Sequence, residues 1–150
     1  QGIQRRFTKI FSIGKRDFYD DYAHHPTEIQ AVVKSARQVH KNRKIICVFQ
    51  PHRYSRVKSL MNEFALSFKL ADEVVLCPVY AAGERKKYNF NQNNFSKLIA
   101  LKSRVQVINI ENERDLQNYV TKNLPNDEIV ICMGAGSISN WIREIVIKLK

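Results

Sequence analysis

Hydrophobic residues fall along the chain in two alternating patterns. Short runs that are almost entirely apolar, as in strands buried on both faces, occupy residues 44–50 (KIICVFQ), 73–79 (EVVLCPV), 105–110 (VQVINI) and 128–133 (EIVICM). Segments with apolar residues three or four positions apart predict helices over residues 56–70, 95–101, 113–124 and 137–149. Strands that alternate with helices in this way predict a parallel sheet covered by helices. Pro78 is expected to end the ladder of its strand.

The N-terminal part of the chain has a different pattern. Residues 5–22 alternate loosely between apolar and polar, and the interruption at Ile13-Gly14-Lys15 predicts two strands joined by a tight turn. A helix is predicted next, because one face of it would carry Ile29, Val32, Val33, Ala36 and Val39. Its start has two alternative signals. Pro26 suits a first helical turn, and Thr27 with Gln30 suits a capping box.

Together these elements predict a single α/β domain over residues 1–150. The expected fold is Rossmann-like and doubly wound, a mostly parallel sheet with helices on both faces and an N-terminal β-hairpin. A chain of 150 residues is long enough to bury one sizeable core. Its apolar runs are strand-sized and no secretory leader is recognisable, so we expect no membrane association.

The three cysteines, Cys47, Cys77 and Cys132, each lie within an apolar run. Their odd number and wide spacing argue against a disulfide framework or a zinc site. We therefore expect buried free thiols, as in a protein of the reducing cytoplasm.

The formal net charge of +11 raises the question of nucleic-acid binding, because basic surfaces bind polyanions. The basic residues are scattered, however, and form no basic helix or recognisable nucleic-acid motif. A solvated basic surface, or clamps for small anionic substrates, explains the charge as well. We expect no nucleic-acid partner.

Histidine, arginine, aspartate and glycine residues, which could bind a ligand or take part in catalysis, lie where the predicted strands end. In open α/β sheets, ligands bind beyond the C-terminal ends of the strands. Four strand ends run into the segments DDYAHHP at 20–26, QPHRYSR at 50–56, VYAAGE at 79–84 and GAGS at 134–137. Three of the four histidines and most of the glycines lie in these segments. This edge of the sheet is the candidate site.

Arg53 and Arg56 are three residues apart near a helix start, so both side chains can point to one side. Guanidinium groups bind a carboxylate or a phosphate through two parallel hydrogen bonds. The alternative is an exposed pair, or salt bridges to Asp20 or Glu84.

His24 and His25 present two imidazole groups close to Asp21 at the same edge. Metal ligation is one interpretation, but adjacent histidines point apart and no third ligand has a helical spacing. We therefore expect no metal site in this chain. For His24, a hydrogen-bonding role in the site and a purely structural role both stay open.

Gly134-Ala135-Gly136 lies between a predicted strand and a predicted helix. It is either a phosphate-binding turn or a tight turn whose backbone approaches a neighbour closely. It lacks the third glycine of the dinucleotide-binding motif, and Gly14-Lys15 lacks the upstream glycine of a P-loop. The residues alone thus predict a site for a small anion without naming a reaction.

The same segments, in the same order, resemble the signature of the Mur ligase family. The matching pieces extend over nearly the whole chain, as RRF at 5–7, DDYAHHPTE at 20–28, FQPHRYSR at 49–56, AD at 71–72, VYAAGE at 79–84 and GAGSI at 134–138. Within the family, the double histidine before proline and the QPHRYSR run are similar to the alanine-adding member.

The resemblance implies the C-terminal domain of a three-domain, ATP-dependent ligase of peptidoglycan synthesis in the cytoplasm. In that scheme ATP phosphorylates the lactyl carboxylate of UDP-N-acetylmuramate, and the amine of L-alanine attacks the acyl phosphate. ATP and Mg²⁺ would be bound mainly by a central domain and the UDP-sugar by an N-terminal domain, both outside this chain. Closure of the C-terminal domain would keep water from the acyl phosphate. The isolated 150 residues are therefore expected to be inactive.

The resemblance also implies roles for single residues. Arg6 would be a cation beside the nucleotide, and Asp21 would accept hydrogen bonds from the ribose hydroxyls. The L-alanine end would be lined by Tyr22, His24, Arg53 and Arg56, with His24, Arg53 and Arg56 as the catalytic set. The two arginines would hold the amino-acid carboxylate and offset charge near the acyl phosphate.

Two alternatives accompany this interpretation. The ligase that attaches recycled tripeptide to the same sugar nucleotide shares much of the signature, and a stand-alone nucleotide- or anion-binding module would need no other domain. Residues 85–95 (RKKYNFNQNNF) lack the Pro/Gly/Ser pattern expected in the family. No ligand contact is assigned to them.

Overall fold

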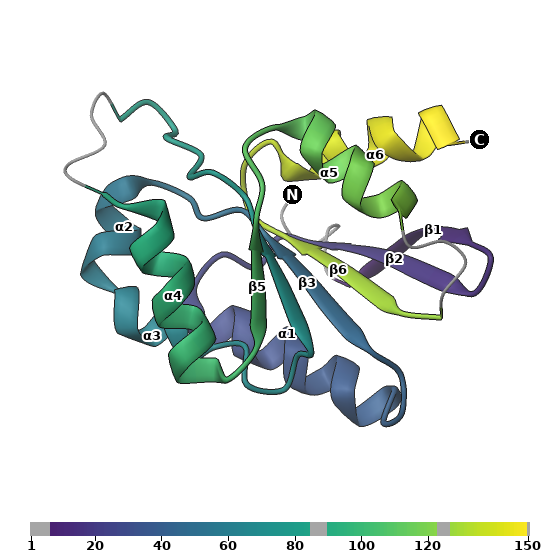
Figure 1. The fold of residues 1–150 in the computed structure, drawn as a ribbon, viewed down its shortest axis with the longest axis horizontal. Coiled ribbons are helices and arrows are strands. Elements are labelled where there is room, and N and C mark those ends of the chain that lie inside the picture. Colours follow the sequence, from purple (N-terminus) through teal and green to yellow (C-terminus); the bar gives the residue numbers. More distant parts are fainter. Residues whose placement is uncertain (1–6, 85–89, 123–126, 150) are drawn as a thin grey trace.

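The computed structural model describes residues 7–84, 90–122 and 127–149. The strands are β1 (Thr8–Ile13), β2 (Arg16–Asp21), β3 (Ile45–Phe49), β4 (Glu73–Leu76), β5 (Gln106–Asn109) and β6 (Ile129–Met133). The helices are α1 (Pro26–Val39), α2 (Tyr54–Ser59), α3 (Met61–Ala65), α4 (Gln92–Ser103), α5 (Glu113–Lys122) and α6 (Ile138–Leu149). The strand order is β1-β2-β6-β3-β4-β5, and only β1 runs antiparallel to its neighbour (Figure 1).

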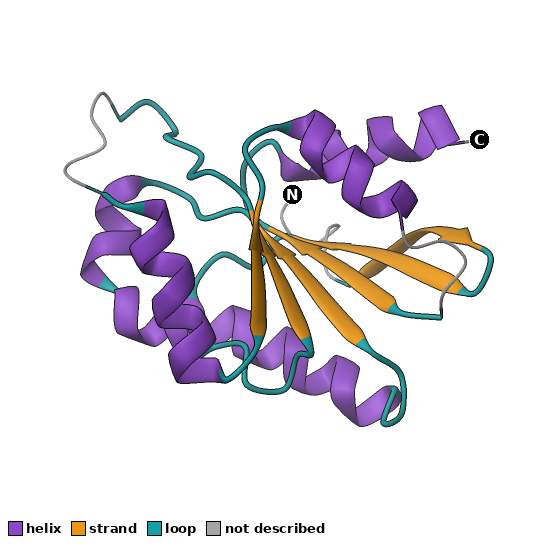
Figure 2. Ribbon diagram, in the orientation of Figure 1, coloured by secondary structure: helices purple, strands orange, loops and turns teal. Residues whose placement is uncertain are grey.

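The sheet separates two layers of helices, with α1 to α4 on one face and α5 and α6 on the other (Figure 2). Side chains of β3 alternate between two cores. Ile45, Cys47 and Phe49 pack with the first layer, whereas Ile46 and Val48 pack with the second. Burial on both faces explains why this strand is apolar at every position. The predicted doubly wound fold and N-terminal hairpin are confirmed.

Pro26 marks the start of α1, and the alternative capping box of Thr27 with Gln30 is wrong. The N-cap residue is His25, and Pro26 occupies the first helical turn. The Glu28 carboxylate accepts the backbone N–H groups of His24 (3.0 Å) and His25 (3.1 Å). Glu28 thus satisfies N–H groups that the helix itself leaves without partners.

The single helix predicted over residues 56–70 is wrong, because two short helices, α2 and α3, meet at Leu60. The backbone of Leu60 leaves the helical region (φ −119°, ψ 26°), and the chain after Ala65 forms turns. Phe64 and Phe68 both pack on Phe49, with ring centroids 5.5 Å apart in each pair. Core packing therefore determines this path, and the periodicity alone does not show the bend.

As expected, β4 ends before Pro78.

The three cysteines are buried free thiols, as predicted. Burial raises the pKa of Cys47 to about 12, and it raises the pKa values of Cys77 and Cys132 as well. Within the described residues, no helix is long and apolar enough to cross a membrane.

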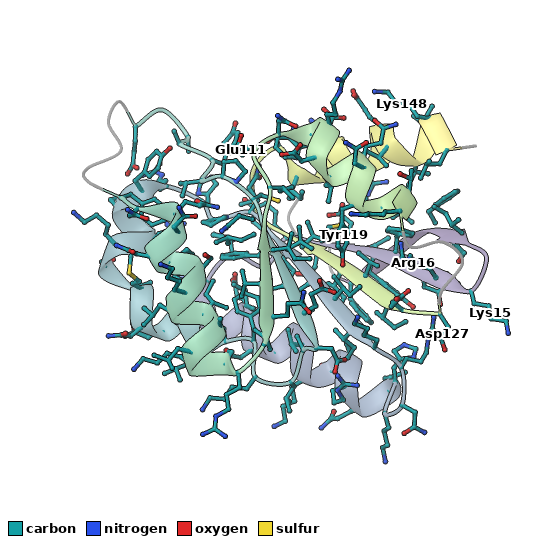
Figure 3. All side chains as sticks on the ribbon, viewed as in Figure 1. Lys15, Arg16, Glu111, Tyr119, Asp127 and Lys148 are labelled. Atoms are coloured by element: carbon teal, nitrogen blue, oxygen red, sulfur yellow. The ribbon has the colours of Figure 1, made fainter. Side chains whose placement is uncertain are left out.

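A buried ion pair joins the hairpin to the rest of the sheet at the amino ends of the parallel strands. The Arg16 side chain is fully buried, and its Nε lies 3.1 Å from Glu128 Oε1. Its Nη1 donates to the carbonyl of Val120 in α5 at 2.9 Å. Arg16 is one of the side chains labelled in Figure 3. Arg16 thereby connects β2, the start of β6 and α5.

Glu128→Ala should destabilise the fold, because Arg16 would remain buried without its carboxylate partner. Loss of one member of a buried pair costs about 3–5 kcal/mol, and urea unfolding measures the change. The matched control is Asp127→Ala, whose side chain is exposed; we expect a change below about 0.5 kcal/mol. Equal effects of the two substitutions would contradict this role for the pair.

Candidate functional site

The four polar segments lie together at the carboxyl edge of the sheet, as the sequence predicted. In the parallel register Asp21 and Phe49 both pair with Met133, and Phe49 pairs with Leu76. The strands β2, β6, β3 and β4 therefore end at nearly the same level. The loops that follow them begin side by side.

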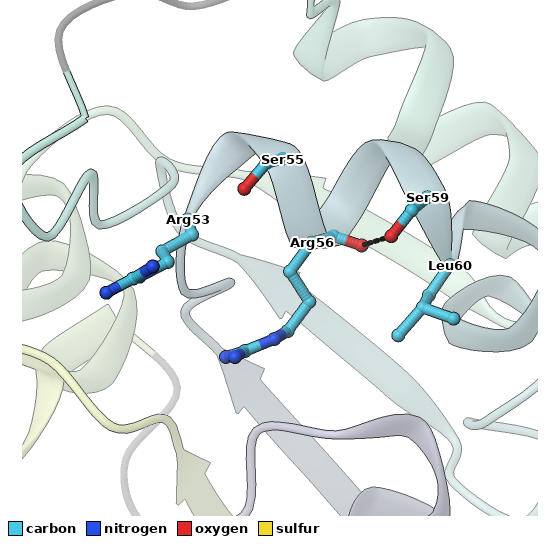
Figure 4. Close-up of a pocket in the computed structure, with 5 residues that line it drawn as sticks. All are labelled: Arg53, Ser55, Arg56, Ser59 and Leu60. Carbon is cyan, nitrogen blue, oxygen red and sulfur yellow. Dashed lines mark hydrogen bonds between the residues drawn. The ribbon is translucent and has the colours of Figure 1, made fainter.

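Arg53 and Arg56 leave α2 on the same side, toward the strand ends (Figure 4). They line an open pocket of about 450 Å³ together with Ser55, Ser59 and Leu60. The Arg56 Nη1 lies 3.5 Å from Nδ1 of His52. Among the described residues, neither arginine forms an ion pair with Asp20 or Glu84. The pocket thus presents two guanidinium groups to a ligand.

An aromatic row of four rings runs along the same edge, formed by Tyr22, His24, His52 and Tyr80. Ring centroids are 5.1 Å apart for Tyr22 and His24, 5.7 Å for His24 and His52, and 5.6 Å for His52 and Tyr80. The two tyrosines at the ends are partly exposed (37% and 39%). The row brings His24, from the loop after β2, close to Arg53 and to the first turns of α2, which carry Arg56.

His24 is oriented by its backbone neighbourhood. Its Nδ1 lies 3.0 Å from the carbonyl oxygen of Tyr22 and 3.6 Å from the Glu28 carboxylate. A carbonyl oxygen only accepts, so Nδ1 carries the hydrogen in this contact. In the neutral ring, Nε2 is then the acceptor. Within the described part of the chain, no three His, Cys, Asp or Glu side chains are grouped as metal ligands.

The Asp21 carboxylate is 5% exposed and accepts two backbone N–H groups. Its Oδ2 is 2.6 Å from the nitrogen of Phe7, and its Oδ1 is 2.8 Å from the nitrogen of Ala23. Phe7 also stacks on Tyr19 at 4.3 Å. Asp21 therefore holds Phe7, the residue before β1, against the site. Arg6, the predicted nucleotide contact, lies outside the described residues.

Gln50 organises the glycine-containing turn, a role that the sequence did not indicate. Its side chain is 2% exposed; Nε2 donates to Ser137 Oγ (2.9 Å), and Oε1 accepts the N–H of Ile138 (3.0 Å). A Cβ on Gly136 would overlap the Tyr80 ring and lie 2.9 Å from Gln50 Oε1. Close backbone approach is thus the feature that requires this glycine. The sequence signal that could have indicated this role of Gln50 is a polar residue directly after a buried strand.

Glu84 binds the first turn of α2 and is the second residue whose role was missed. Its Oε1 accepts the N–H groups of Tyr54 (2.6 Å) and Ser55 (3.3 Å), and its Oε2 accepts the Ser55 hydroxyl. The hydrogen bond from Ser55 lowers the pKa of this carboxyl, followed by the backbone contacts and the charge of Arg53. Glu84 is therefore ionised at neutral pH.

His52 is held in its neutral form by its surroundings. Desolvation is the largest cause that lowers its pKa, and the charges of His24, Arg56 and Arg53 act in the same direction. Glu84 opposes them. A neutral His52 can accept a hydrogen bond from Arg56, which a protonated ring cannot do.

An α/β domain with arginine and histidine side chains beyond its strand ends has the features of a domain that binds small anions. The chain belongs to the Mur ligase family, because residues 5–136 match the family model described as "Mur ligase, glutamate ligase domain". The resemblance inferred from the motifs is confirmed.

Two relatives carry more specific names. A UDP-N-acetylmuramate–L-alanine ligase of Pelagibacter ubique is 50% identical over 145 residues, which are 97% of this chain and 31% of the relative. The crystal structure of a UDP-N-acetylmuramate-alanine ligase, MurC, of Thermotoga maritima covers 97% of this chain and 30% of its own, at 30% identity and a TM-score of 0.74. This chain thus spans about a third of the length of these relatives.

A third structure shows the same fold as a separate unit. It is a domain of a Haemophilus ducreyi UDP-N-acetylmuramate:L-alanyl-gamma-D-glutamyl-meso-diaminopimelate ligase, 18% identical, with a TM-score of 0.70. The match covers 97% of this chain and 100% of that one. The architecture therefore forms in that protein without further domains.

The stability that His52 contributes should decrease at acid pH. Because its pKa is lowered from 6.5 in the folded chain, the unfolded chain binds more protons below that pH. The contribution is therefore present above about pH 6.5 and is lost as the pH falls through the folded-state pKa. Urea unfolding between pH 8 and pH 5 should show the difference between wild type and His52→Asn shrinking. A constant difference would contradict the assignment.

Proposed function

We propose that this chain is the C-terminal domain of a ligase that joins L-alanine to UDP-N-acetylmuramate in peptidoglycan precursor synthesis. The observation that carries the proposal is the pair Arg53 and Arg56 on one side of α2, beside His52 and close to His24. The 50% identity to the Pelagibacter ligase supports this choice.

Arg53 and Arg56 hold the carboxylate of L-alanine in the proposed site. Two guanidinium groups that flank one pocket can bind a carboxylate through paired, charge-assisted hydrogen bonds. Their charge also offsets the negative charge that develops on the nearby acyl phosphate. Tyr22 and His24 form the side of the site that faces the amine.

His24 orients and deprotonates the attacking amine. With Nδ1–H donated to the Tyr22 carbonyl, Nε2 accepts a proton from the alanine ammonium group. The amine nitrogen then forms a bond to the carbonyl carbon of the acyl phosphate. The bond between that carbon and the phosphate oxygen breaks, and phosphate leaves with the electron pair. The second proton of the nitrogen passes to the departing phosphate. The product is an amide, with ADP from the earlier phosphorylation step.

The nucleotide contacts assigned to Arg6 and Asp21 form the other half of the proposal. Asp21 already accepts from Phe7 and Ala23, and a carboxylate has about four acceptor positions. In the proposed contact, ribose hydroxyls donate to the Asp21 carboxylate. The bond from the N–H of Phe7 holds Phe7 at this edge of the sheet.

ATP and Mg²⁺ are bound mainly by other domains in this proposal. No cluster of three His, Cys, Asp or Glu side chains occurs among the described residues, and the proposal assigns no step on this domain to Mg²⁺. An N-terminal domain for the UDP-sugar and a central domain for ATP complete the enzyme, which acts in the cytoplasm. This domain closes on them and excludes water from the acyl phosphate.

The second candidate is the ligase that adds a recycled tripeptide to the same sugar nucleotide. The Haemophilus domain named above supports it by fold alone, at 18% identity. Its substrate also offers a carboxylate and an amine, so the two candidates differ in the size of the added group. A stand-alone anion-binding module is the third candidate.

Loss of either arginine should weaken the use of L-alanine selectively. We expect Arg53→Ala and Arg56→Ala in the full-length protein to raise the KM for L-alanine by about 10- to 100-fold, since a hydrogen bond to a charged group contributes about 1.5–3 kcal/mol. Arg→Lys at each position keeps the charge but loses the planar guanidinium that donates two parallel hydrogen bonds. It should give an intermediate effect. Phosphate release with ATP, Mg²⁺ and UDP-N-acetylmuramate measures the rates.

Lys58→Ala is the matched control, because Lys58 is an exposed cation on the same helix. It should leave the KM for L-alanine within about twofold, as expected for a surface substitution. Phosphate release that requires a peptide in place of alanine would support the recycling ligase. If the protein with intact motifs releases no phosphate, the anion-binding module is the candidate function that remains.

The isolated 150 residues should release no phosphate from ATP under the same conditions, because the proposed site for the triphosphate lies in another domain. The full-length protein at equal concentration is the positive control. ATP-dependent amide formation by the isolated chain would contradict the division of the site between domains.

A further inference from the structure

The residue before helix α2 has a side chain that cannot cap the helix. The N-cap position usually holds a side chain that accepts a hydrogen bond from the first turn. Here it is Arg53, whose guanidinium has donors and no acceptor. The backbone of Arg53 also has a positive φ of 74°, which is uncommon for a residue with a side chain. Local sequence therefore does not stabilise this helix start.

The loop after β4 supplies the hydrogen-bond acceptors that the Arg53 side chain lacks. The backbone N–H of Tyr80 donates to the carbonyl of Pro51, and the backbone carbonyl of Tyr80 accepts the N–H of Arg53. Both bonds are 2.8 Å long. A turn with positive φ at Ala82 (52°) and Gly83 (91°) then directs Glu84 toward α2. The Glu84 carboxylate accepts the N–H groups of the first turn and the Ser55 hydroxyl, as described above. The capping group thus comes from about 30 positions along the chain.

We propose that Glu84 is a positioning residue for the proposed L-alanine site. Its carboxylate fixes the first turn of α2, and so fixes the direction in which Arg53 and Arg56 leave the helix. Its negative charge is directed to the backbone of α2, and among the described residues it forms no ion pair with either guanidinium. Both arginines can therefore face the same ligand. This inference rests on the function proposed above.

The first arm of the test uses the chain alone and does not depend on the reaction. Amide hydrogen exchange of Tyr54 and Ser55 is compared in wild type, Glu84→Ala and Glu63→Ala. Glu63 is an exposed glutamate on the next helix, α3. Glu84→Ala should speed exchange at both amides by about tenfold or more, because their acceptor is lost. Glu63→Ala should not change it.

The second arm uses the full-length protein and steady-state kinetics. Glu84→Ala should raise the KM for L-alanine by about tenfold or more, because a misplaced clamp binds the carboxylate poorly. The KM values for ATP and UDP-N-acetylmuramate should stay within about twofold. Glu84→Gln keeps one acceptor oxygen and should fall between wild type and Glu84→Ala. A general loss of folding would lower the rate for all three substrates alike.

The outcomes separate this inference from the proposed function. Unchanged exchange at Tyr54 and Ser55 in Glu84→Ala overturns the positioning role, whatever the reaction is. An unchanged KM for L-alanine also overturns it, if Arg53→Ala raises that KM in the same assay. A wild-type protein that shows no alanine dependence overturns the proposed function, and the exchange experiment still decides whether Glu84 holds α2.

Discussion

The arrangement of the site depends on the register of the parallel strands. Asp21, Met133, Phe49 and Leu76 end their strands at one level because β6 pairs in register with both β2 and β3, and β3 pairs with β4. A slip of one residue would exchange the two faces of a strand, and β3 and β6 are buried on both faces. At the opposite end, the buried contact of Arg16 with Glu128 ties β2 to the start of β6. Core packing and this ion pair together fix where the polar loops begin.

Much of the fold and the location of the site could be predicted from the sequence. Continuous apolar runs such as residues 45–49 indicate strands covered on both faces, and such strands are parallel. Once the strands are parallel, the segments that follow them must lie at a common edge. Three of the histidines (His24, His25 and His52), Arg53 and the Gly134-Ala135-Gly136 turn could therefore be grouped from the sequence. For the start of α1, Pro26 was one of two alternative signals, and the sequence alone did not decide between them.

The remaining features depend on contacts between residues far apart in the chain. Gln50 reaches Ser137 and Ile138, and Glu84 reaches Tyr54 and Ser55. Local patterns contain no information on such pairs. The bend at Leu60 has the same origin, since it follows from packing on Phe49. In each case tertiary contacts determine a detail that propensity and periodicity leave open.

The proposed site centres on a carboxylate held by Arg53 and Arg56 beside His24. The most direct measurement is a crystal structure of the full-length protein with UDP-N-acetylmuramate, a non-hydrolysable ATP analogue and L-alanine. We expect the alanine carboxylate within about 2.7–3.2 Å of a guanidinium nitrogen of Arg53 or Arg56, with the amine directed toward His24. Alanine bound elsewhere, with both guanidinium groups in solvent, would contradict it.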